Sequence, residues 1–185
     1  RTLRTRARTE TPQSTSPEPA LLMKTFTRTL VLVALSLVVA CGGDDPVAPV
    51  GNINGTFSGS VEGQSFSGTL AVVAVHTAGV LSITATQTAD PVQKQIDIRV
   101  LNVTAPGTFS LAPSGANTAT YTETTNGNVK TWITSLAGGG GSVVITQLSA
   151  THVTGTYTFA APAVSSTGAT STKNANAGSF SIDIR

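Results

Sequence analysis

The stretch "HVTGTYTF", residues 152–159, indicates the fold most directly, because apolar and polar side chains alternate along it. Val153, Tyr157 and Phe159 occupy odd-numbered positions, and threonines occupy the even-numbered positions after the histidine. Successive side chains of a β-strand point to opposite faces of a sheet, so this period of two predicts a strand with one buried face. Tyr157 shares that face with Phe159, which favours a core position for its ring.

Two other segments alternate in the same way. "QIDIRV" (95–100) places isoleucine and valine opposite aspartate and arginine, and "SFSIDIR" (179–185) places phenylalanine and isoleucine opposite serine, aspartate and arginine. Residues 51–185 contain 23 threonines and few charged residues. Threonine, valine, isoleucine and aromatic residues suit a pleated surface, and no segment has a helical period. The composition therefore predicts an all-β domain.

Turn residues divide this domain into about ten strands. The Asn-Gly pair at 126–127 predicts a two-residue hairpin, and most other connections are short, so neighbouring strands should pair antiparallel. The exception is a predicted polar loop over 161–176. We expect an antiparallel β-sandwich, with an up-and-down β-barrel as the alternative. The predicted strands are 54–61, 65–76, 79–87, 94–103, 107–112, 118–125, 129–136, 142–149, 152–160 and 177–185.

A glycine, a hydroxyl residue and a large apolar residue recur together in the domain. The five copies start at residues 55, 68, 107, 155 and 178, and their spacings differ, which argues against a solenoid. We interpret each copy as the start of a strand. The glycine relaxes the entry from a turn, the hydroxyl faces solvent and the large residue enters the core.

Charge divides the 185-residue chain near residue 40. Residues 1–40 carry a formal charge of +4 and residues 41–185 carry −2, so the overall +2 does not describe the β-rich part. Nucleic-acid binding needs clustered basic side chains on the folded domain, and the five basic residues there are scattered. They are Lys94, Arg99, Lys130, Lys173 and Arg185. We therefore expect no nucleic-acid partner.

The segment from 23 to 40 has the features of a secretory signal peptide. Met23 is the only methionine, Lys24 and Arg28 follow it, and residues 30–40 are almost entirely apolar. Eleven residues that each rise about 1.5 Å are too few to cross a hydrocarbon core of roughly 30 Å. A cleaved signal peptide is thus favoured over a transmembrane helix.

The only cysteine of the chain follows this apolar run directly, in "LVVACGGDD" (37–45). Val38, Val39 and Ala40, followed by Cys41, resemble the bacterial lipobox, the recognition sequence of the lipoprotein signal peptidase. The resemblance implies a diacylglycerol on the Cys41 sulfur, cleavage before this residue, and acylation of the new amino group. A glycine after the cysteine implies, by the same resemblance, delivery to the outer membrane. A single cysteine also excludes an intrachain disulfide framework.

The chain accordingly divides into four predicted parts. Residues 1–22 are an upstream extension without apolar periodicity, 23–40 the lipoprotein signal peptide, 41–53 a flexible tether rich in glycine and proline, and 54–185 the all-β domain. Translation is expected to begin at Met23. The membrane is then a partner through the lipid on Cys41.

The second half of the β-domain resembles an uncharacterised family of bacterial envelope lipoproteins. The ordered motifs are "GTFSL", "ATYTET", "GSVVITQLSATHVTGTYTF" and "AGSFSIDI" within residues 107–185, and "NGTFSGSVEGQSF" (54–66) is a looser counterpart. They describe strands and turns, so the resemblance implies an all-β fold. It implies no activity and no catalytic residues.

No constellation of reactive residues is evident in the sequence. The two histidines, His76 and His152, are expected at strand ends, and no G-x-S-x-G motif accompanies them. The carboxylates are sparse and form no clustered cation loop. We expect no enzyme activity, no cofactor and no metal. A hydrolase whose site is assembled in space from distant residues ranks third among the functional alternatives.

The candidate binding residues are Trp132 and Tyr121, which carry large rings with polar atoms. If they are exposed together, they offer a surface on which sugar rings stack; if they are buried, they fill the core. The favoured function is a lipid-anchored envelope domain that binds a glycan or an envelope protein, or has a structural role in adhesion. The alternative is a barrel that carries an apolar ligand in its interior.

Overall fold

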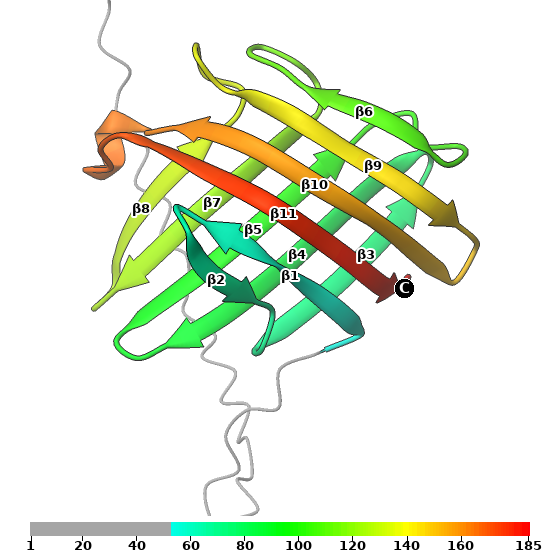
Figure 1. Cartoon of the computed structure of the whole chain (residues 1–185), viewed down its shortest axis with the longest axis horizontal. Helices are drawn as coiled ribbons and strands as arrows, with labels where there is room; N and C mark the ends of the chain where they lie inside the picture. Colours follow the sequence, from blue (N-terminus) through cyan, green and yellow to red (C-terminus); the bar gives the residue numbers. More distant parts are fainter. Residues whose placement is uncertain (1–52) are drawn as a thin grey trace, which may run out of the picture. The chain divides into compact units, whose positions relative to one another are not determined.

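The computed structural model describes residues 53–185, which form two antiparallel β-sheets packed face to face (Figure 1). The larger sheet contains β1 (Gly55–Val61), β2 (Gln64–Ser67), β6 (Gly107–Leu111), β9 (Gly140–Leu148), β10 (His152–Pro162) and β11 (Thr172–Asp183). The smaller contains β3 (Ala71–Thr77), β4 (Val80–Ala89), β5 (Val92–Val100), β7 (Thr118–Thr125) and β8 (Asn128–Ile133). The predicted all-β sandwich is confirmed.

The strands are ordered β2-β1-β11-β10-β9-β6 in the larger sheet and β3-β4-β5-β7-β8 in the smaller. The three alternating segments behave as predicted. Residues 152–159 lie in β10, near the middle of the larger sheet, with Val153, Tyr157 and Phe159 buried. The inward-facing residues of both sheets form one core, in which the Phe57 and Tyr157 rings stack 4.7 Å apart.

The predicted strand over 65–76 is wrong in one respect, because the structure divides it into β2 and β3. The chain leaves the larger sheet at Gly68, whose N–H donates to the Phe57 carbonyl of β1. The N–H groups of Thr69 and Leu70 then donate to the carbonyl of Thr86 in β4, in the smaller sheet. Satisfying these backbone donors on two different sheets is what separates the strands.

The predicted loop over 161–176 is also shorter than expected. Strand β10 continues to Pro162 and β11 starts at Thr172, where the two residues are register partners. Ala161 and Ala175 are buried, so the alternation of the two strands persists through this polar segment. The connection is 163–171, and it includes a short 3-10 helix, η1 (Ser165–Thr167).

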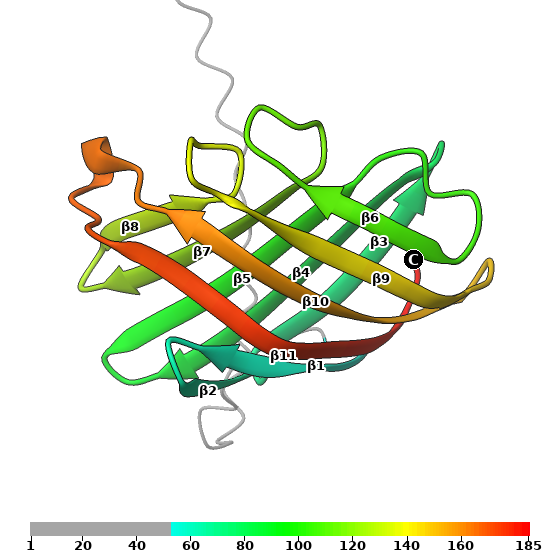
Figure 2. The ribbon, with the colours of Figure 1, turned by 45° about the horizontal axis from the view of Figure 1, so that its top comes forward.

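The barrel alternative is excluded, because the two sheets do not close into one. Within residues 53–185, only isolated bridges link the sheets along their edges, such as those between Ala74 and Ile184 and between Trp132 and Ala163. A closed barrel needs a continuous ladder between its first and last strands. Figure 2 shows the strands of the larger sheet running across those of the smaller at an angle, as in a two-layer sandwich.

The Asn126–Gly127 hairpin between β7 and β8 is confirmed, with φ of 49° and 79° at its two central residues. These left-handed values define a type I′ turn. The interpretation of the recurring glycine motif holds only for Gly55 and Gly107, which start β1 and β6. The copies at 155 and 178 lie inside β10 and β11 instead.

In these two copies, each glycine makes room for an aromatic ring on the neighbouring strand. Gly155 is the register partner of Phe180, and Gly178 is the partner of Tyr157. A Cβ atom on either glycine would overlap the partner's ring. Small and large residues therefore alternate across the β10–β11 pair, which fixes where the two rings lie in the core.

Residues 1–52 lie outside the described part of the chain. The predictions of an upstream extension, a signal peptide, lipidation of Cys41 and a tether fall on these residues, except for residue 53 at the end of the tether. Within residues 53–185, no helix is long and apolar enough to span a membrane.

Candidate functional site

Tyr121 and Trp132 are register partners in the antiparallel pair of β7 and β8, and both rings point into the sandwich. Only 1% of Tyr121 and 2% of Trp132 are exposed, and the ring centres are 5.6 Å apart. The Nε1–H of Trp132 donates to the carbonyl of Thr170, at 3.1 Å. The two rings are thus core residues, which is the second of the two alternatives that the sequence left open.

One step beyond these rings, the inward-facing positions of the smaller sheet become polar. The apolar row consists of Ala85, Ile96, Tyr121 and Trp132. A second row of register partners lies two residues away on each strand, toward the same edge of the sandwich. This row, called here the polar row, consists of Gln87, Lys94, Glu123 and Lys130. The core therefore ends at this edge of the sandwich in alternating cationic and anionic groups. Among the described residues, the buried Oε1 of Gln87 has no hydrogen-bond partner.

Lys173 of β11 approaches this row from the opposite sheet. Its Nζ lies 3.3 Å from Oε1 of Glu123, 4.9 Å from the centre of the Trp132 ring and 5.9 Å from that of Tyr121. The Tyr121 hydroxyl donates to the same Glu123 oxygen, at 2.9 Å. Burial raises the pKa of the Tyr121 phenol, and its bond to Glu123 raises it further, so the phenol stays a donor.

These groups line a cleft of about 360 Å³ at the end of the sandwich, called here the Lys173 cleft. Its lining comprises Glu62, Glu123, Lys130, Trp132, Lys173 and the hydroxyl residues 170–172. Glu62 accepts hydrogen bonds from the backbone N–H of Asn174 at 2.6 Å and from its side-chain amide at 2.9 Å. These bonds lower the pKa of Glu62, the backbone bond most.

The connection between β10 and β11 forms one wall of the cleft, because it is fastened to the edge strand β8. The N–H of Val164 donates to the Thr131 carbonyl at 2.9 Å, and the N–H of Thr131 donates to Oγ1 of Thr167 at 3.0 Å. Gly168 ends η1 in the left-handed conformation, with φ of 72°. Hydrogen bonds on both sides thus hold this segment over Trp132.

A second polar cluster lies at the other end of β10. Oδ1 of Asp183 is 2.7 Å from Nδ1 of His152, and Oγ of Ser181 is 3.1 Å from Nε2. The side chains of His152 and Asp183 are 39% and 73% exposed, so this cluster lies on the solvated face of the larger sheet. His152 is the first residue of β10, as expected for a strand-end histidine.

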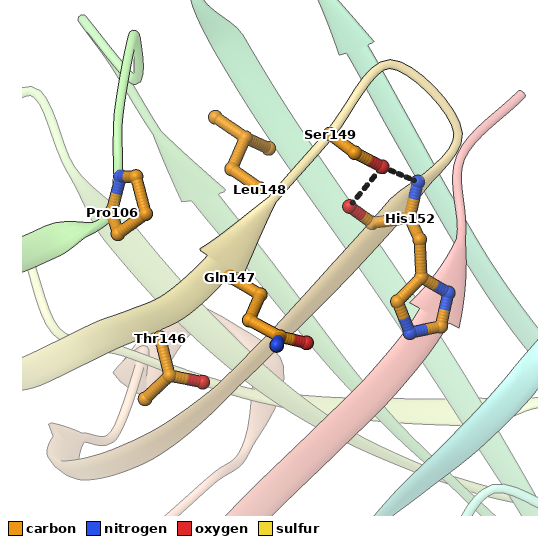
Figure 3. A pocket seen from close by; sticks show the side chains of 6 residues that line it. All are labelled: Pro106, Thr146, Gln147, Leu148, Ser149 and His152. Carbon is orange, nitrogen blue, oxygen red and sulfur yellow. Dashed lines mark hydrogen bonds between the residues drawn. The ribbon is translucent and has the colours of Figure 1, made fainter.

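A surface groove of about 430 Å³ borders His152 (Figure 3). Pro106, Leu148 and the polar residues Thr146, Gln147 and Ser149 line it together with the histidine. Oγ of Ser149 accepts a hydrogen bond from the backbone N–H of His152 at 2.9 Å, and it also donates to the His152 carbonyl at 3.2 Å. The turn before β10 is therefore held in one conformation beside the groove.

Sequence reasoning missed Ser181 and Asp183 as partners of His152, and it missed Lys173, Glu123 and Glu62 as lining residues. One signal for Lys173 was available, because the alternation in "TKNA" (172–175) places it on the same face as the buried Ala175. No comparable signal exists for Ser181, since only the register between strands brings it to His152.

The comparisons with known proteins identify a family without an assigned function. The model of DUF6252, described as a domain of unknown function, matches residues 53–182. This range starts with the first described residue and ends inside β11, so it covers nearly the whole sandwich. Neither the curated proteins nor the solved structures contain a match. The chain belongs to the DUF6252 family.

Proposed function

We propose that the chain is a lipid-anchored protein of the bacterial outer membrane whose β-sandwich binds a glycan in the Lys173 cleft. Support for the anchor comes from the sequence, where an apolar run and the small residues Val38, Val39 and Ala40 precede the single cysteine, Cys41. Support for binding comes from one observation: acidic and basic side chains share the cleft with hydroxyl groups and the buried Trp132.

The chemistry of the cleft suits a polyhydroxylated ligand. Sugar hydroxyls both donate and accept hydrogen bonds, and the cleft offers carboxylate acceptors, ammonium donors and hydroxyls that do both. Bonds to charged groups contribute about 1.5–3 kcal/mol each, roughly twice those between neutral groups. The volume of about 360 Å³ lies within the range that small-ligand sites have.

In this proposal, Trp132 has a different role from the one that the sequence suggested. The face of its ring is covered by Lys173, so the indole does not stack on a sugar. Its ring instead holds the Lys173 ammonium by a cation–π contact, while Glu123 holds the same ammonium electrostatically. The donor that faces the ligand is thus positioned before binding, which reduces the entropy lost on association.

The carrier alternative is disfavoured by the packing between the sheets. The rings of Phe57, Tyr157 and Phe180 lie in the centre of the sandwich, with the Phe57 and Phe180 centroids 6.4 Å apart. A carrier needs this space for its ligand, and here side chains fill it.

Glycan binding is tested with the full chain on a glycan array, followed by calorimetric titration of any oligosaccharide that the array retains. Lys130→Ala should weaken binding by about tenfold, because it removes one charge-assisted hydrogen bond from the exposed rim of the cleft. Arg99→Ala is the matched control, since this exposed cation lies on the outer face of β5 and away from the cleft. Absence of any retained glycan, or equal weakening by both variants, would contradict the proposal.

The anchor is tested separately with Cys41→Ser, expressed in a Gram-negative bacterium. The variant should accumulate as an unprocessed precursor without lipid, measured by intact mass and by labelling with a fatty-acid analogue. Normal processing of this variant would show that an ordinary signal peptidase is at work.

A further inference from the structure

We infer that Ser181, His152 and Asp183 form a hydrolytic site for carboxylic esters, with Ser181 as the nucleophile and His152 as its base. This activity goes beyond the proposed glycan binding and lies at the opposite end of β10 from the Lys173 cleft. It also departs from the expectation, based on the sequence, that the domain carries out no chemistry. The observation behind it is that each ring nitrogen of one imidazole faces a different functional partner.

The hydrogen bonds determine which nitrogen carries the proton. An ionised carboxylate only accepts hydrogen bonds, so the 2.7 Å contact with Asp183 requires Nδ1 of His152 to be the donor. In the neutral imidazole Nε2 is then an acceptor, and the hydroxyl of Ser181 donates to it at 3.1 Å. This is the tautomer that a general base for a serine nucleophile needs.

The sheet holds the three side chains in place. His152 and Asp183 are register partners in the β10–β11 pair, and Ser181 precedes Asp183 by two residues, so all three project from the same face. Both strands are flanked by other strands, β9 beside β10 and β1 beside β11. Asp183 serves as a positioning residue, because it orients the ring without contacting the substrate.

Two hydroxyl donors flank the nucleophile. Thr56 of β1 and Thr154 of β10 are the register partners of Ser181, one on each side and on the same face. Directly opposite residues have Cβ atoms about 5 Å apart, which places both hydroxyls near an oxygen on a carbon bonded to Ser181. Thr154 also bonds to the hydroxyl of Thr146, and when Thr146 is the donor in that bond the proton of Thr154 is available to the oxyanion. Thr56 and Thr154 would stabilise the developing oxyanion in place of backbone N–H groups, which the strand ladders already use.

The groove beside His152 gives the ester a place to bind. Thr146 of β9 lines the groove, and its hydroxyl is 2.8 Å from that of Thr154 on the neighbouring strand β10. Thr154 is in turn the register partner of Ser181 on β11, so the groove wall lies two strands from the nucleophile. Leu148 and Pro106 supply the apolar part of its lining. The structure thus assigns an ester whose apolar group is long enough to reach this lining across about two strand spacings, or roughly 10 Å.

The reaction balances without a cofactor. Oγ of Ser181 bonds to the acyl carbon while its proton moves to Nε2 of His152, and collapse of the tetrahedral intermediate breaks the ester C–O bond. The leaving alkoxide takes the proton from Nε2 and departs as the alcohol. Water then attacks the acyl-serine, with His152 again accepting and returning a proton, so the products are a carboxylic acid and free Ser181.

The test uses the full chain and a fluorophosphonate, which bonds to an activated serine with loss of fluoride. Peptide mapping by mass spectrometry should find Ser181 labelled at least tenfold faster than Ser179. Ser179 is the internal control, because it projects from the same face of β11 but its hydroxyl lies 3.1 Å from that of Ser58 instead of a histidine. Hydrolysis of p-nitrophenyl acetate should disappear in Ser181→Ala and remain in Ser179→Ala.

The roles of the other two residues are separated by further variants. His152→Ala should abolish labelling of Ser181, and Asp183→Ala should reduce it about tenfold or more, with partial recovery in Asp183→Glu. Circular dichroism and the unfolding midpoint verify that each variant is folded. Labelling that is absent, or equal at Ser179 and Ser181, would overturn the inference. Loss of glycan binding would leave it standing, since no residue is shared between the two sites.

Discussion

The two ends of strand β10 carry polar groups in opposite environments. At the Pro162 end, the side chains of Lys173 and Glu123 are each only 24% exposed and lie beside buried aromatic rings. At the His152 end, the side chain of Asp183 is 73% exposed on the outer face of the larger sheet. Electrostatic interactions are weakly screened in the first environment and strongly screened in the second. Polar contacts should therefore stabilise the fold at the cleft and contribute little to stability at the histidine.

The largest expected effect is that of Trp132→Ala at the cleft end. The substitution empties a buried site and removes the donor to the Thr170 carbonyl, so the free energy of unfolding should fall by about 3–5 kcal/mol. Equilibrium unfolding in urea measures this loss. His152→Ala, at the other end, is the comparison variant and should lose about 1 kcal/mol or less. Equal losses would break the distinction between the two ends.

The next effect is that of Lys173→Met, which keeps most of the apolar stem and removes the ammonium. Glu123 then loses its ion-pair partner in a half-buried place, so the free energy of unfolding should fall by about 1 kcal/mol. Asp183→Asn is the matched comparison at the exposed end. An unchanged urea midpoint for Lys173→Met would show that water screens the cleft as fully as the outer face.

A smaller and pH-dependent effect is expected for Glu62. Its bonds from Asn174 hold its folded-state pKa below the ordinary 4.5, so ionised Glu62 stabilises the fold above that pH. This contribution is lost as the pH falls from about 4.5 through the lowered value. Glu62→Gln should therefore flatten the acid side of the stability curve, measured by urea unfolding between pH 3 and pH 6. If the stability of Glu62→Gln falls as steeply with decreasing pH as that of the parent chain, Glu62 is not the group responsible for this acid dependence.

The smallest effect is expected for Asp183→Asn, which keeps the size of the side chain and removes its charge. Because this carboxylate is mostly exposed, the change in the free energy of unfolding should stay within about 0.5 kcal/mol. The same variant should slow the labelling of Ser181 well beyond what so small a loss of stability explains. A loss above about 2 kcal/mol in the free energy of unfolding would instead show that the contact between Asp183 and His152 stabilises the fold.

Much of the fold could be predicted because alternation records burial directly. The residues of 95–100 and 152–159 that alternation predicted to face inward are buried, and the Asn-Gly pair determined its hairpin locally. The division of 65–76 could not be predicted in this way. It depends on Thr69 and Leu70 donating to the carbonyl of Thr86, a partner in another sheet that no local pattern records.

The candidate sites were harder to predict because strand register creates them. His152 and Ser181 are 29 residues apart, and Glu123 and Lys173 are 50 apart, so neither pair is visible as a motif. Trp132 and Tyr121 could be singled out from the sequence as rings with polar atoms. Their burial, however, depends on the packing of the opposite sheet, which the sequence around them does not record. In the structure both rings are buried, only Trp132 of the two lines the Lys173 cleft, and the charged neighbours Lys130 and Lys173 line the same cleft.

The order of strands in the larger sheet also governs when the domain can form. Strand β11, the last of the described strands to be synthesised, lies between β10 and β1, the first of them. Until residues 172–183 emerge, β1 and β2 have only each other to pair with, and an isolated hairpin is marginal in water. The sandwich therefore assembles only after residues 172–183 have been synthesised, through contacts that span more than a hundred residues and favour slow folding. Under the proposed lipid anchoring, this delay would favour export, because a chain that has not yet folded can be threaded across a membrane.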